Sequence, residues 1–209
     1  MNIAVGEWGW IHKNCMKGIR KPDEPEPRKR RPTDQEITLI CKELGYRPDA
    51  IVSTIRQRVA VCFLFALETA MRASEITNLK RSEVFFSEGY IKVTGEELTA
   101  KKTRSAIRSV PLTAEAKRLI SQIYNSPNIG KFLFGVRYHH IGGLFYEAVQ
   151  KANVFDLKFH DSRHEGITRL ARIYKVLDLA RIIGHRDIQG LMVYYNPTIE
   201  ELVSRMPKA

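Results

Sequence analysis

The sequence predicts an α+β fold that is mainly α-helical and has a small antiparallel β-sheet. The helical part is predicted by long apolar stretches and helix-start signals in both halves of the chain. The sheet is predicted by two segments of strand character, residues 90–94 and 108–112, which flank a polar and basic middle. The pattern therefore indicates a helical domain with a hairpin whose tip is exposed.

Residues 1–32 predict a tail ahead of this domain. Residues 1–20 read as a short helical piece that carries Trp8 and Trp10. Residues 21–32 combine four prolines with a run of Lys and Arg, a composition that disfavours regular structure. This stretch is either an interdomain linker or a solvated tether.

The globular domain is expected to cover residues 33–209. Its start is marked by Thr33 and Glu36, which form a capping box ahead of an apolar run. A last helix is expected after Asn196, which suits an N-cap, with Pro197 in the first turn. The other helices are expected at residues 49–69, 113–124 and 142–152. The first of these three is apolar on most sides, so we expect it to be a buried core helix.

Composition limits the possible partners and the setting of the chain. There are 34 Lys and Arg against 23 Asp and Glu, a formal charge of +11, which favours a polyanionic partner or simply a solubilising surface. The three cysteines have no Cys-x-x-Cys spacing, so neither a disulfide framework nor a metal site is predicted. The apolar stretch at residues 59–67 is far shorter than the about 20 residues that span a bilayer. No secretion signal is predicted either, and we expect a cytoplasmic protein without a membrane partner.

The C-terminal part of the chain gathers residue types that suit chemistry on a phosphodiester. They are His160, Arg163, His185 and Tyr194. A phosphodiester under attack develops charge on its nonbridging oxygens, and guanidinium and imidazole donors stabilise that charge. A tyrosine hydroxyl, with an ordinary pKa of about 10, needs a base or a cationic field before it can act as a nucleophile.

One more cation is expected from upstream. In the stretch AMRASEITNLKRSEV, Arg72 lies where an apolar helix gives way to a polar one, and Glu75 is its expected orienting partner. With this stretch, FHDSRHEGITRLAR and IIGHRDIQGLMVYYNPT in order, the chain resembles the catalytic domain of the tyrosine recombinases, the phage integrase family. The resemblance spans most of the chain. It implies the catalytic-domain fold of that family and a DNA substrate.

The resemblance implies a role for each matched residue. Arg72 and Arg163 are expected to clamp the scissile phosphate, and His185 is expected to donate a hydrogen bond to it. His160 is expected to be a proton-transfer partner, whereas Glu75 supports the fold. These roles would make the chain a DNA strand transferase.

The resemblance also implies a nucleophile and a general acid. Tyr194 follows His185 by nine residues, the usual offset in the family, which selects it over Tyr195 as the residue that forms a 3′-phosphotyrosyl link and releases a 5′-hydroxyl. The general acid is expected on the hairpin at Lys102, if the turn is one residue longer than usual in the family, with Lys101 as the alternative. No metal or nucleotide cofactor is implied, and strand exchange would pass through a Holliday junction.

The implied partner is double-stranded DNA, in the cytoplasm of a bacterial or phage-infected cell. The C-terminal helix would dock on a neighbouring protomer to form a homotetramer on DNA, or else pack on its own core. Basic residues of the hairpin and the linker are expected to contact DNA phosphates: Lys101, Arg104, Arg108, Lys29, Arg30 and Arg31.

Two other functions fit parts of the pattern. A type IB topoisomerase would use nearly the same residues, but it acts as a monomer, and the short helix after the tyrosine suits exchange within a tetramer better. Residues 1–20 resemble the end of a preceding core-binding domain, so a truncated fragment that only binds DNA is the other alternative. The full set of expected catalytic residue types favours an active recombinase.

Overall fold

The computed structural model describes residues 2–20, 28, 30–94, 107–127, 130–185 and 189–192. The helices are α1 (Asn2–Gly6), α2 (Asp34–Glu43), α3 (Ile55–Thr69), α4 (Ala73–Asn78), α5 (Ala114–Tyr124), α6 (Tyr138–Lys151), α7 (Asp161–Ala171), α8 (Val176–Ile183) and α9 (Gln189–Met192). A short 3-10 helix, η1 (Arg81–Glu83), precedes the strands β1 (Val84–Phe85), β2 (Tyr90–Val93) and β3 (Arg108–Pro111). Over the described ranges, none of the helices has both the length and the apolar character needed to cross a bilayer.

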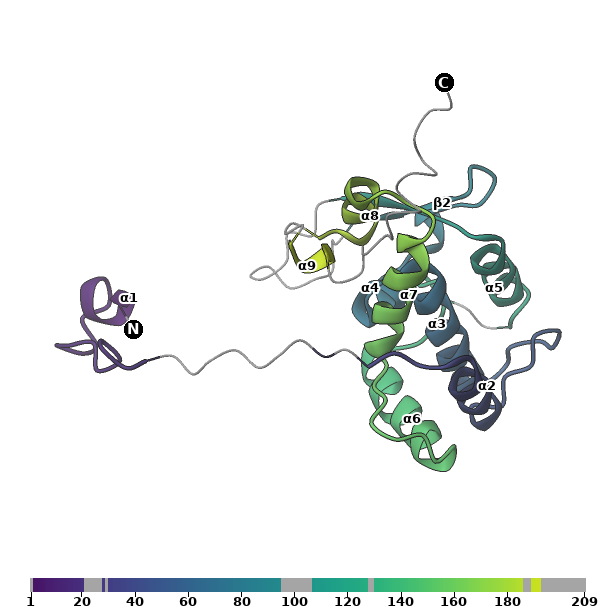
Figure 1. Cartoon of the computed structure of the whole chain (residues 1–209), viewed down its shortest axis with the longest axis horizontal. Coiled ribbons are helices and arrows are strands. Elements are labelled where there is room, and N and C mark those ends of the chain that lie inside the picture. Colours follow the sequence, from purple (N-terminus) through teal and green to yellow (C-terminus); the bar gives the residue numbers. More distant parts are fainter. Residues whose placement is uncertain are drawn as a thin grey trace, which may run out of the picture.

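Helix α3 forms the centre of the helical body (Figure 1). Thr54 caps its start, because Thr54 Oγ1 accepts the N–H of Gln57 at 3.2 Å and the Gln57 side chain accepts the N–H of Thr54 at 3.0 Å. Residues 58–63 and 65–67 are buried, as the apolar pattern predicts. The helix ends at Ala70, whose φ of 52° lies in the left-handed region.

The predicted start of this helix at residue 49 was wrong. The capping box places the first turn at Ile55, and the preceding segment is an irregular loop. The Gln122 amide holds that loop by donating to Arg47 O at 3.0 Å and to Ala50 O at 2.7 Å. The capping box at Thr33 is confirmed, and α6 begins four residues before the predicted start at 142.

Helix α7 packs closely against α3 at one glycine. A Cβ built on Gly166 would lie 2.7 Å from Ala66 O, 3.0 Å from Leu67 O and 3.1 Å from the Cα of Ala70. Only a residue without a side chain permits this approach of the two backbones. The close crossing places the first turn of α7 beside the C-terminal end of α3.

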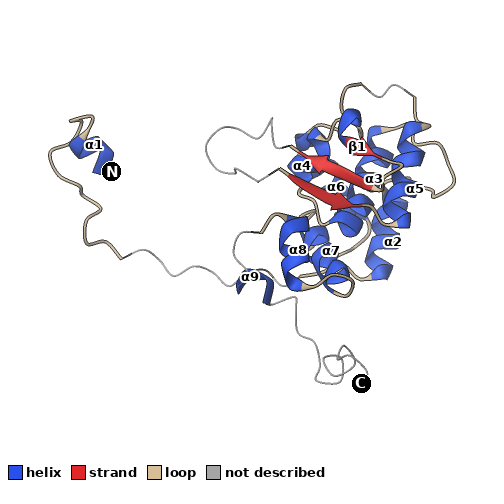
Figure 2. Ribbon diagram, turned by 90° about the horizontal axis from the view of Figure 1, so that it is seen from above, coloured by secondary structure: helices blue, strands red, loops and turns tan. Residues whose placement is uncertain are grey.

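The sheet covers one end of the helical body and contacts α8 through β3 (Figure 2). Its order is β1-β2-β3, all antiparallel, with Ile91 opposite Val110 and Val93 opposite Arg108. The predicted small antiparallel sheet is therefore confirmed. Strand β1 was not predicted, because a two-residue strand is too short to show an alternating pattern.

Candidate active site

Arg72 lies at the start of α4, just after the end of α3. Its backbone N–H donates to Glu75 Oε2 at 2.9 Å, and its Nη1 donates to Glu75 Oε1 at 3.1 Å. The Glu75 side chain is fully buried, whereas 32% of the Arg72 side chain is exposed. Glu75 therefore orients Arg72, as expected, and leaves the arginine within reach of a ligand from solvent.

The same carboxylate binds a second arginine, from the sheet. Arg108 Nη1 and Nη2 donate to the two Glu75 oxygens at 2.9 and 2.8 Å, and Arg108 Nε donates to Ile182 O at 2.8 Å. Burial alone would raise the pKa of Glu75, but the bonds and charge of Arg108, helped by Arg72, hold that pKa below its ordinary value. Glu75 is therefore an ionised bridge between two arginines.

This position of Arg108 differs from the DNA contact expected for it. Only 5% of its side chain is exposed, and its guanidinium is occupied by Glu75 and Ile182. The sequence analysis missed one signal for this buried position. Arg108 and the buried Val110 are two residues apart on β3, so their side chains lie on the same face of the strand. Arg108 is an internal anchor that joins β3, α4 and the end of α8.

Arg163, on the first turn of α7, is held by two backbone carbonyls. Its Nη1 donates to Ala70 O, and its Nη2 donates to Ile183 O at 3.0 Å. Ala70 lies two residues before Arg72, and Ile183 lies two residues before His185. Arg163 therefore brings together the three chain segments that carry the predicted phosphate-binding residues.

His160 precedes α7, and its ring lies edge to face with that of His164, with the centroids 5.6 Å apart. Burial lowers the pKa of His160, and the nearby His164 and Arg163 lower it further. Burial also lowers the pKa of His164, although Asp161 partly opposes this. A lowered pKa of His160 favours the neutral imidazole, which suits the predicted proton transfer. The contact with His164 was not predicted, although i and i+4 spacing brings side chains together on a helix.

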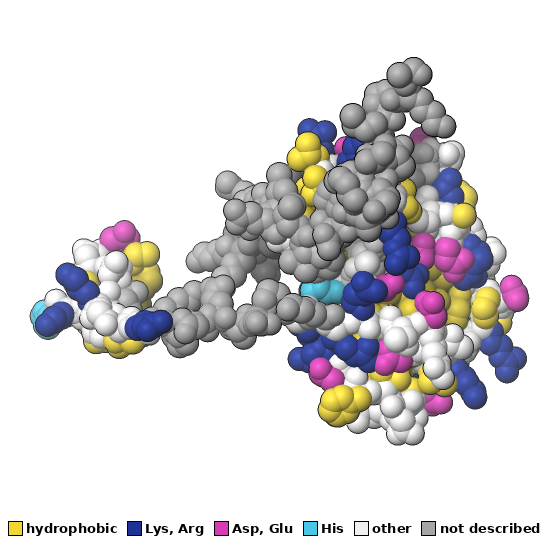
Figure 3. Space-filling view, in the orientation of Figure 1, with side chains coloured by type: hydrophobic (Ala, Val, Ile, Leu, Met, Phe, Trp, Pro, Cys, Tyr) yellow, Lys and Arg dark blue, Asp and Glu magenta, His cyan; other side chains and the backbone are white. Residues whose placement is uncertain are grey.

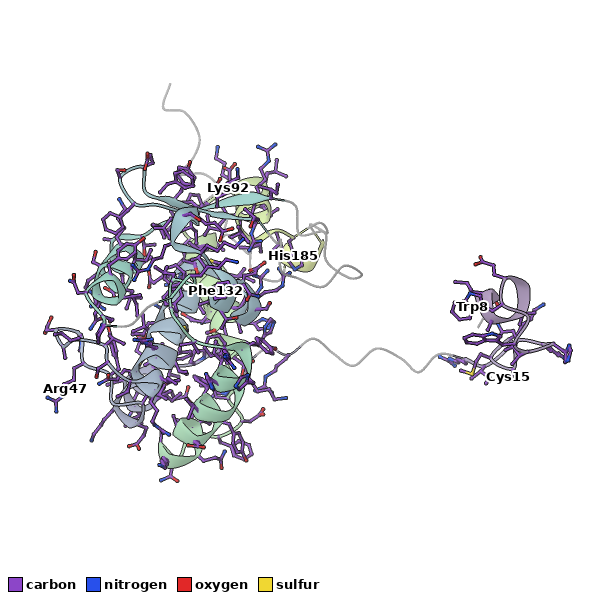
Figure 4. The ribbon with its side chains drawn as sticks, turned by 180° about the vertical axis from the view of Figure 1, so that it is seen from behind. Trp8, Cys15, Arg47, Lys92, Phe132 and His185 are labelled. Carbon is purple, nitrogen blue, oxygen red and sulfur yellow. The ribbon has the colours of Figure 1, made fainter. Side chains whose placement is uncertain are left out.

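His185 follows the end of α8. Gly184, with φ of 68°, ends that helix, and the N–H of His185 donates to Ala180 O at 3.0 Å. Gly190 of α9 lies against the imidazole, because a Cβ there would be 3.1 Å from His185 Cε1. Figure 4 shows His185 at the edge of the helical body beside α9.

Several predicted site residues lie outside the described part of the chain, and their roles remain predictions. They are Lys29, Lys101, Lys102, Arg104, Tyr194 and the alternative Tyr195. Of the linker arginines, Arg30 pairs with Glu36, and Arg31 Nε lies 3.1 Å from Glu165 Oε2. Both arginines thus bind carboxylates of the helical body.

The described site is a cluster of guanidinium and imidazole groups around the ends of three helices. On the face of the helical body drawn in Figure 3, histidine surface lies next to Lys and Arg side chains. Donors in such an arrangement are preorganised for a phosphate, because buried backbone and carboxylate partners already fix them. Among the described residues, no group of three His, Cys, Asp or Glu side chains forms a metal-binding cluster. Arg72 is a partly exposed donor of the cluster, with 32% of its side chain exposed, whereas Arg163 is only 4% exposed and already bonds two carbonyls. A phosphate contact of Arg163 and His185 remains a prediction.

The chain is similar to known proteins over most of its length. The model of the Phage integrase family matches residues 32–201. A Haemophilus influenzae protein named "Putative integrase/recombinase" is 34% identical over 201 residues, which cover 96% of this chain and 64% of that relative. The chain therefore spans less than two thirds of the length of this curated relative.

Solved structures share the fold. An integrase of the Tn1549 transposon, in complex with circular intermediate DNA, matches with a TM-score of 0.65 and 21% identity over 87% of this chain and 67% of the other. The catalytic domain of bacteriophage HP1 integrase matches with a TM-score of 0.59 and 22% identity, over 84% of this chain and 93% of the other. The predicted fold class is confirmed. The matched sequence and the shared fold show that this chain belongs to the phage integrase family, the tyrosine recombinases.

Proposed function

We propose that the chain is the catalytic domain of a site-specific DNA recombinase that cleaves and rejoins strands through a 3′-phosphotyrosyl intermediate. Residues 33–209 would form this domain, and residues 1–32 would be a tail and linker that follow a core-binding domain. Relatives are named as integrases and recombinases, and the Tn1549 integrase was solved with DNA. The net charge of +11 favours a polyanionic partner.

In the proposed reaction, the Tyr194 hydroxyl attacks a DNA phosphate. A bond forms between the tyrosine oxygen and phosphorus, and the bond to the 5′-oxygen breaks. His160, whose pKa is lowered by partial burial and by neighbouring His164 and Arg163, accepts the tyrosine proton. Lys102 gives a proton to the leaving 5′-oxygen. The phosphodiester energy is kept in the covalent link, so the reaction would need neither metal nor ATP.

The charge of the transition state falls on the nonbridging oxygens of the phosphate. Arg72, Arg163 and His185 would stabilise it, because fixed donors act without reorganising during the reaction. The observation that carries the proposal is the pair of bonds from Arg163 to Ala70 O and Ile183 O. These bonds join the end of α3, two residues before Arg72, to the end of α8, two residues before His185.

Exchange would follow when the 5′-hydroxyl of a partner strand attacks the phosphotyrosyl link and reverses the first step. Two such exchanges pass through a Holliday junction. We propose that a homotetramer on DNA performs them, with the C-terminal helix docking on a neighbouring protomer. Analytical ultracentrifugation with and without a DNA site, on the full chain and on a chain ending before Asn196, tests this assembly.

Covalent trapping tests the chemistry. Nicked suicide substrates made from candidate sites or pooled genomic fragments are incubated with the wild type, Tyr194→Phe and Tyr195→Phe, and separated on a denaturing gel. We expect a covalent band that only Tyr194→Phe loses. Loss of the band only in Tyr195→Phe would move the nucleophile by one residue. DNA binding without any covalent band would favour the fragment that only binds DNA.

A further inference from the structure

Arg28, in the linker segment, binds the middle of the connection between α6 and α7 and the first residue of α7. Its Nε donates to Asp161 Oδ1 at 2.7 Å, and its Nη2 donates to Asp161 Oδ2 at 2.9 Å. Its Nη1 donates to Asp156 Oδ1 and Oδ2 at 3.1 and 2.9 Å, and Nη2 also contacts Asp156 O. One guanidinium thus bridges Asp156 and Asp161 from outside.

Asp161 is unusual in its burial, and Asp156 is unusual in its backbone conformation. The Asp161 side chain is fully buried, and its Oδ2 also accepts the N–H of Lys158 at 2.8 Å. Asp156 has φ of 46°, in the left-handed region, which non-glycine residues seldom adopt. A buried carboxylate needs its cationic partner, because the unpaired charge is costly without water. The Arg28 side chain, 30% exposed, supplies that partner from a distant part of the sequence.

The connection held by Arg28 leads directly into the candidate active site. Asp161 is the first residue of α7, His160 precedes it, and Arg163 follows two residues later. The N–H of Arg163 donates to His160 O at 3.0 Å, so the turn is continuous with both side chains. A movement of the Asp161 turn would therefore move the imidazole and the guanidinium together.

We propose that Arg28 is a positioning residue for DNA cleavage: by bridging Asp156 and Asp161, it fixes the turn that sets His160 and Arg163. This inference rests on the proposed function. It gives the linker a task in the reaction that is separate from any contact with DNA. Whatever precedes the linker would then be mechanically connected to the active site through one arginine.

The test compares Arg28→Gln, Asp161→Asn and the double variant with Arg56→Gln as the control. Arg56 also binds a carboxylate, Glu147 Oε2 at 2.9 Å, and has a similar exposure of 33%, but its partner is exposed and far along the chain from the site residues. Single-turnover cleavage of a suicide substrate is measured at saturating DNA, and the dissociation constant for DNA is measured separately. Hydrogen exchange of the backbone amides is followed without DNA.

We expect Arg28→Gln and Asp161→Asn each to slow cleavage by about 10- to 100-fold, the effect of a misplaced catalytic group. The double variant should be no slower than Arg28→Gln alone, because the bonds that Asp161→Asn would weaken are already absent in that variant. If Arg28 acts by positioning the turn and not by contacting phosphate, the dissociation constant for DNA should change by less than about twofold. Amides of residues 158–164 should exchange faster in Arg28→Gln and remain as in the wild type in Arg56→Gln.

Four results would count against the positioning role. They are wild-type cleavage rates in Arg28→Gln, additive losses in the double variant, a loss confined to DNA affinity, and faster exchange over the whole chain rather than at residues 158–164. If the wild type itself forms no covalent product, the proposed function fails instead. The exchange experiment then still decides whether Arg28 fixes the turn, since it uses no DNA.

Discussion

At the residue scale, Glu75 holds two arginines of different exposure with one buried carboxylate. Arg72 reaches solvent, whereas Arg108 is enclosed and also binds Ile182 O. The partly exposed Arg72 and the enclosed Arg108 are therefore held by the same carboxylate. This division explains why a basic residue of the hairpin lies inside the domain.

Replacing Arg108 by Ala should destabilise the fold strongly. The change leaves Glu75 buried without its main partner, which costs about 3–5 kcal/mol when one member of a buried ion pair is removed. Denaturant unfolding measures the loss, with the exposed Lys92→Ala on the adjacent strand β2 as the control. The double variant Arg108→Met with Glu75→Gln should recover part of the stability. A loss of less than about 1 kcal/mol, the range of surface pairs, would contradict this account.

The histidine pair predicts a dependence of stability on pH. Burial and neighbouring cations lower the pKa of His160 and His164 below the ordinary 6.5. The unfolded chain then binds more protons than the folded chain at mildly acidic pH, so folding is less favourable there. The stability that depends on neutral His160 and His164 should be fully present above about pH 6.5. It should be lost as the pH falls through the lowered pKa values of the two histidines in the folded chain.

The measurement is the free energy of unfolding between about pH 7.5 and 5 for the wild type and for a variant with both His160→Gln and His164→Gln. The variant should lose less stability over this range than the wild type does. An identical pH dependence in both proteins would mean that other groups cause it. Comparison between the two proteins cancels the contribution of the carboxylates.

At the scale of the elements, the crossing of α3 and α7 depends on Gly166. Replacing it by Ala should destabilise the domain by about 1–3 kcal/mol, because the new methyl group meets backbone carbonyls that cannot move aside. Gly142→Ala on α6 is the matched control, since its Cβ would meet no atom within 4 Å. That change should stabilise by about 0.5–1 kcal/mol, as alanine does in a helix. Denaturant unfolding gives the change in the free energy of unfolding for both variants. Equal changes would contradict the close crossing of α3 and α7 at Gly166.

Helices α2 and α3 show what the sequence could predict. Capping residues and apolar periodicity are local signals, so the capped start at Thr33 and the buried character of α3 could be read directly. The start of α3 was misplaced, because the loop before it depends on the Gln122 amide from a distant helix. Long-range contacts of this kind produce no periodic pattern in the sequence.

The candidate site divides in the same way. The residue types and their order predicted Arg72, Glu75, His160 and Arg163 as site residues. The structure bonds Arg72 to Glu75 and Arg163 to Ala70, two residues before Arg72, while their roles remain predictions. The internal role of Arg108 and the bond of Arg28 to Asp161 depend on pairs that are 33 and 133 residues apart. No spacing rule connects such pairs. The nucleophile and the general acid remain predictions from the resemblance.

At the scale of the whole molecule, the charge of +11 predicts DNA binding that weakens steeply with salt. The slope of log affinity against log salt concentration falls by about 0.9 for each phosphate contact that is lost. Arg30 and Arg31 bind Glu36 and Glu165, which compete with phosphates. Replacing both arginines by Gln should therefore reduce the slope by less than about 1.8.

Fluorescence anisotropy of labelled DNA at several salt concentrations gives both slopes. If the slope falls by the full amount of about 1.8 in the double variant, about two phosphate contacts have been lost. That result would mean that Arg30 and Arg31 leave their carboxylates when DNA binds. Lys42→Gln and Lys151→Gln, at the last turns of α2 and α6, provide a charge-matched control. A wild-type affinity that does not change with salt would contradict an electrostatic encounter altogether.

The bonds of Arg163 to Ala70 O and Ile183 O have a consequence for how a gene of this kind decays. A gene copy that loses Arg163 loses the two bonds that join the end of α3 to the end of α8, and also the proposed contact with phosphate. The encoded protein should then be less stable and be degraded by proteases. A copy altered only at the predicted nucleophile, Tyr194, keeps both of these bonds. Inactive copies that persist because their product still occupies DNA should therefore retain the arginine long after the nucleophile has gone.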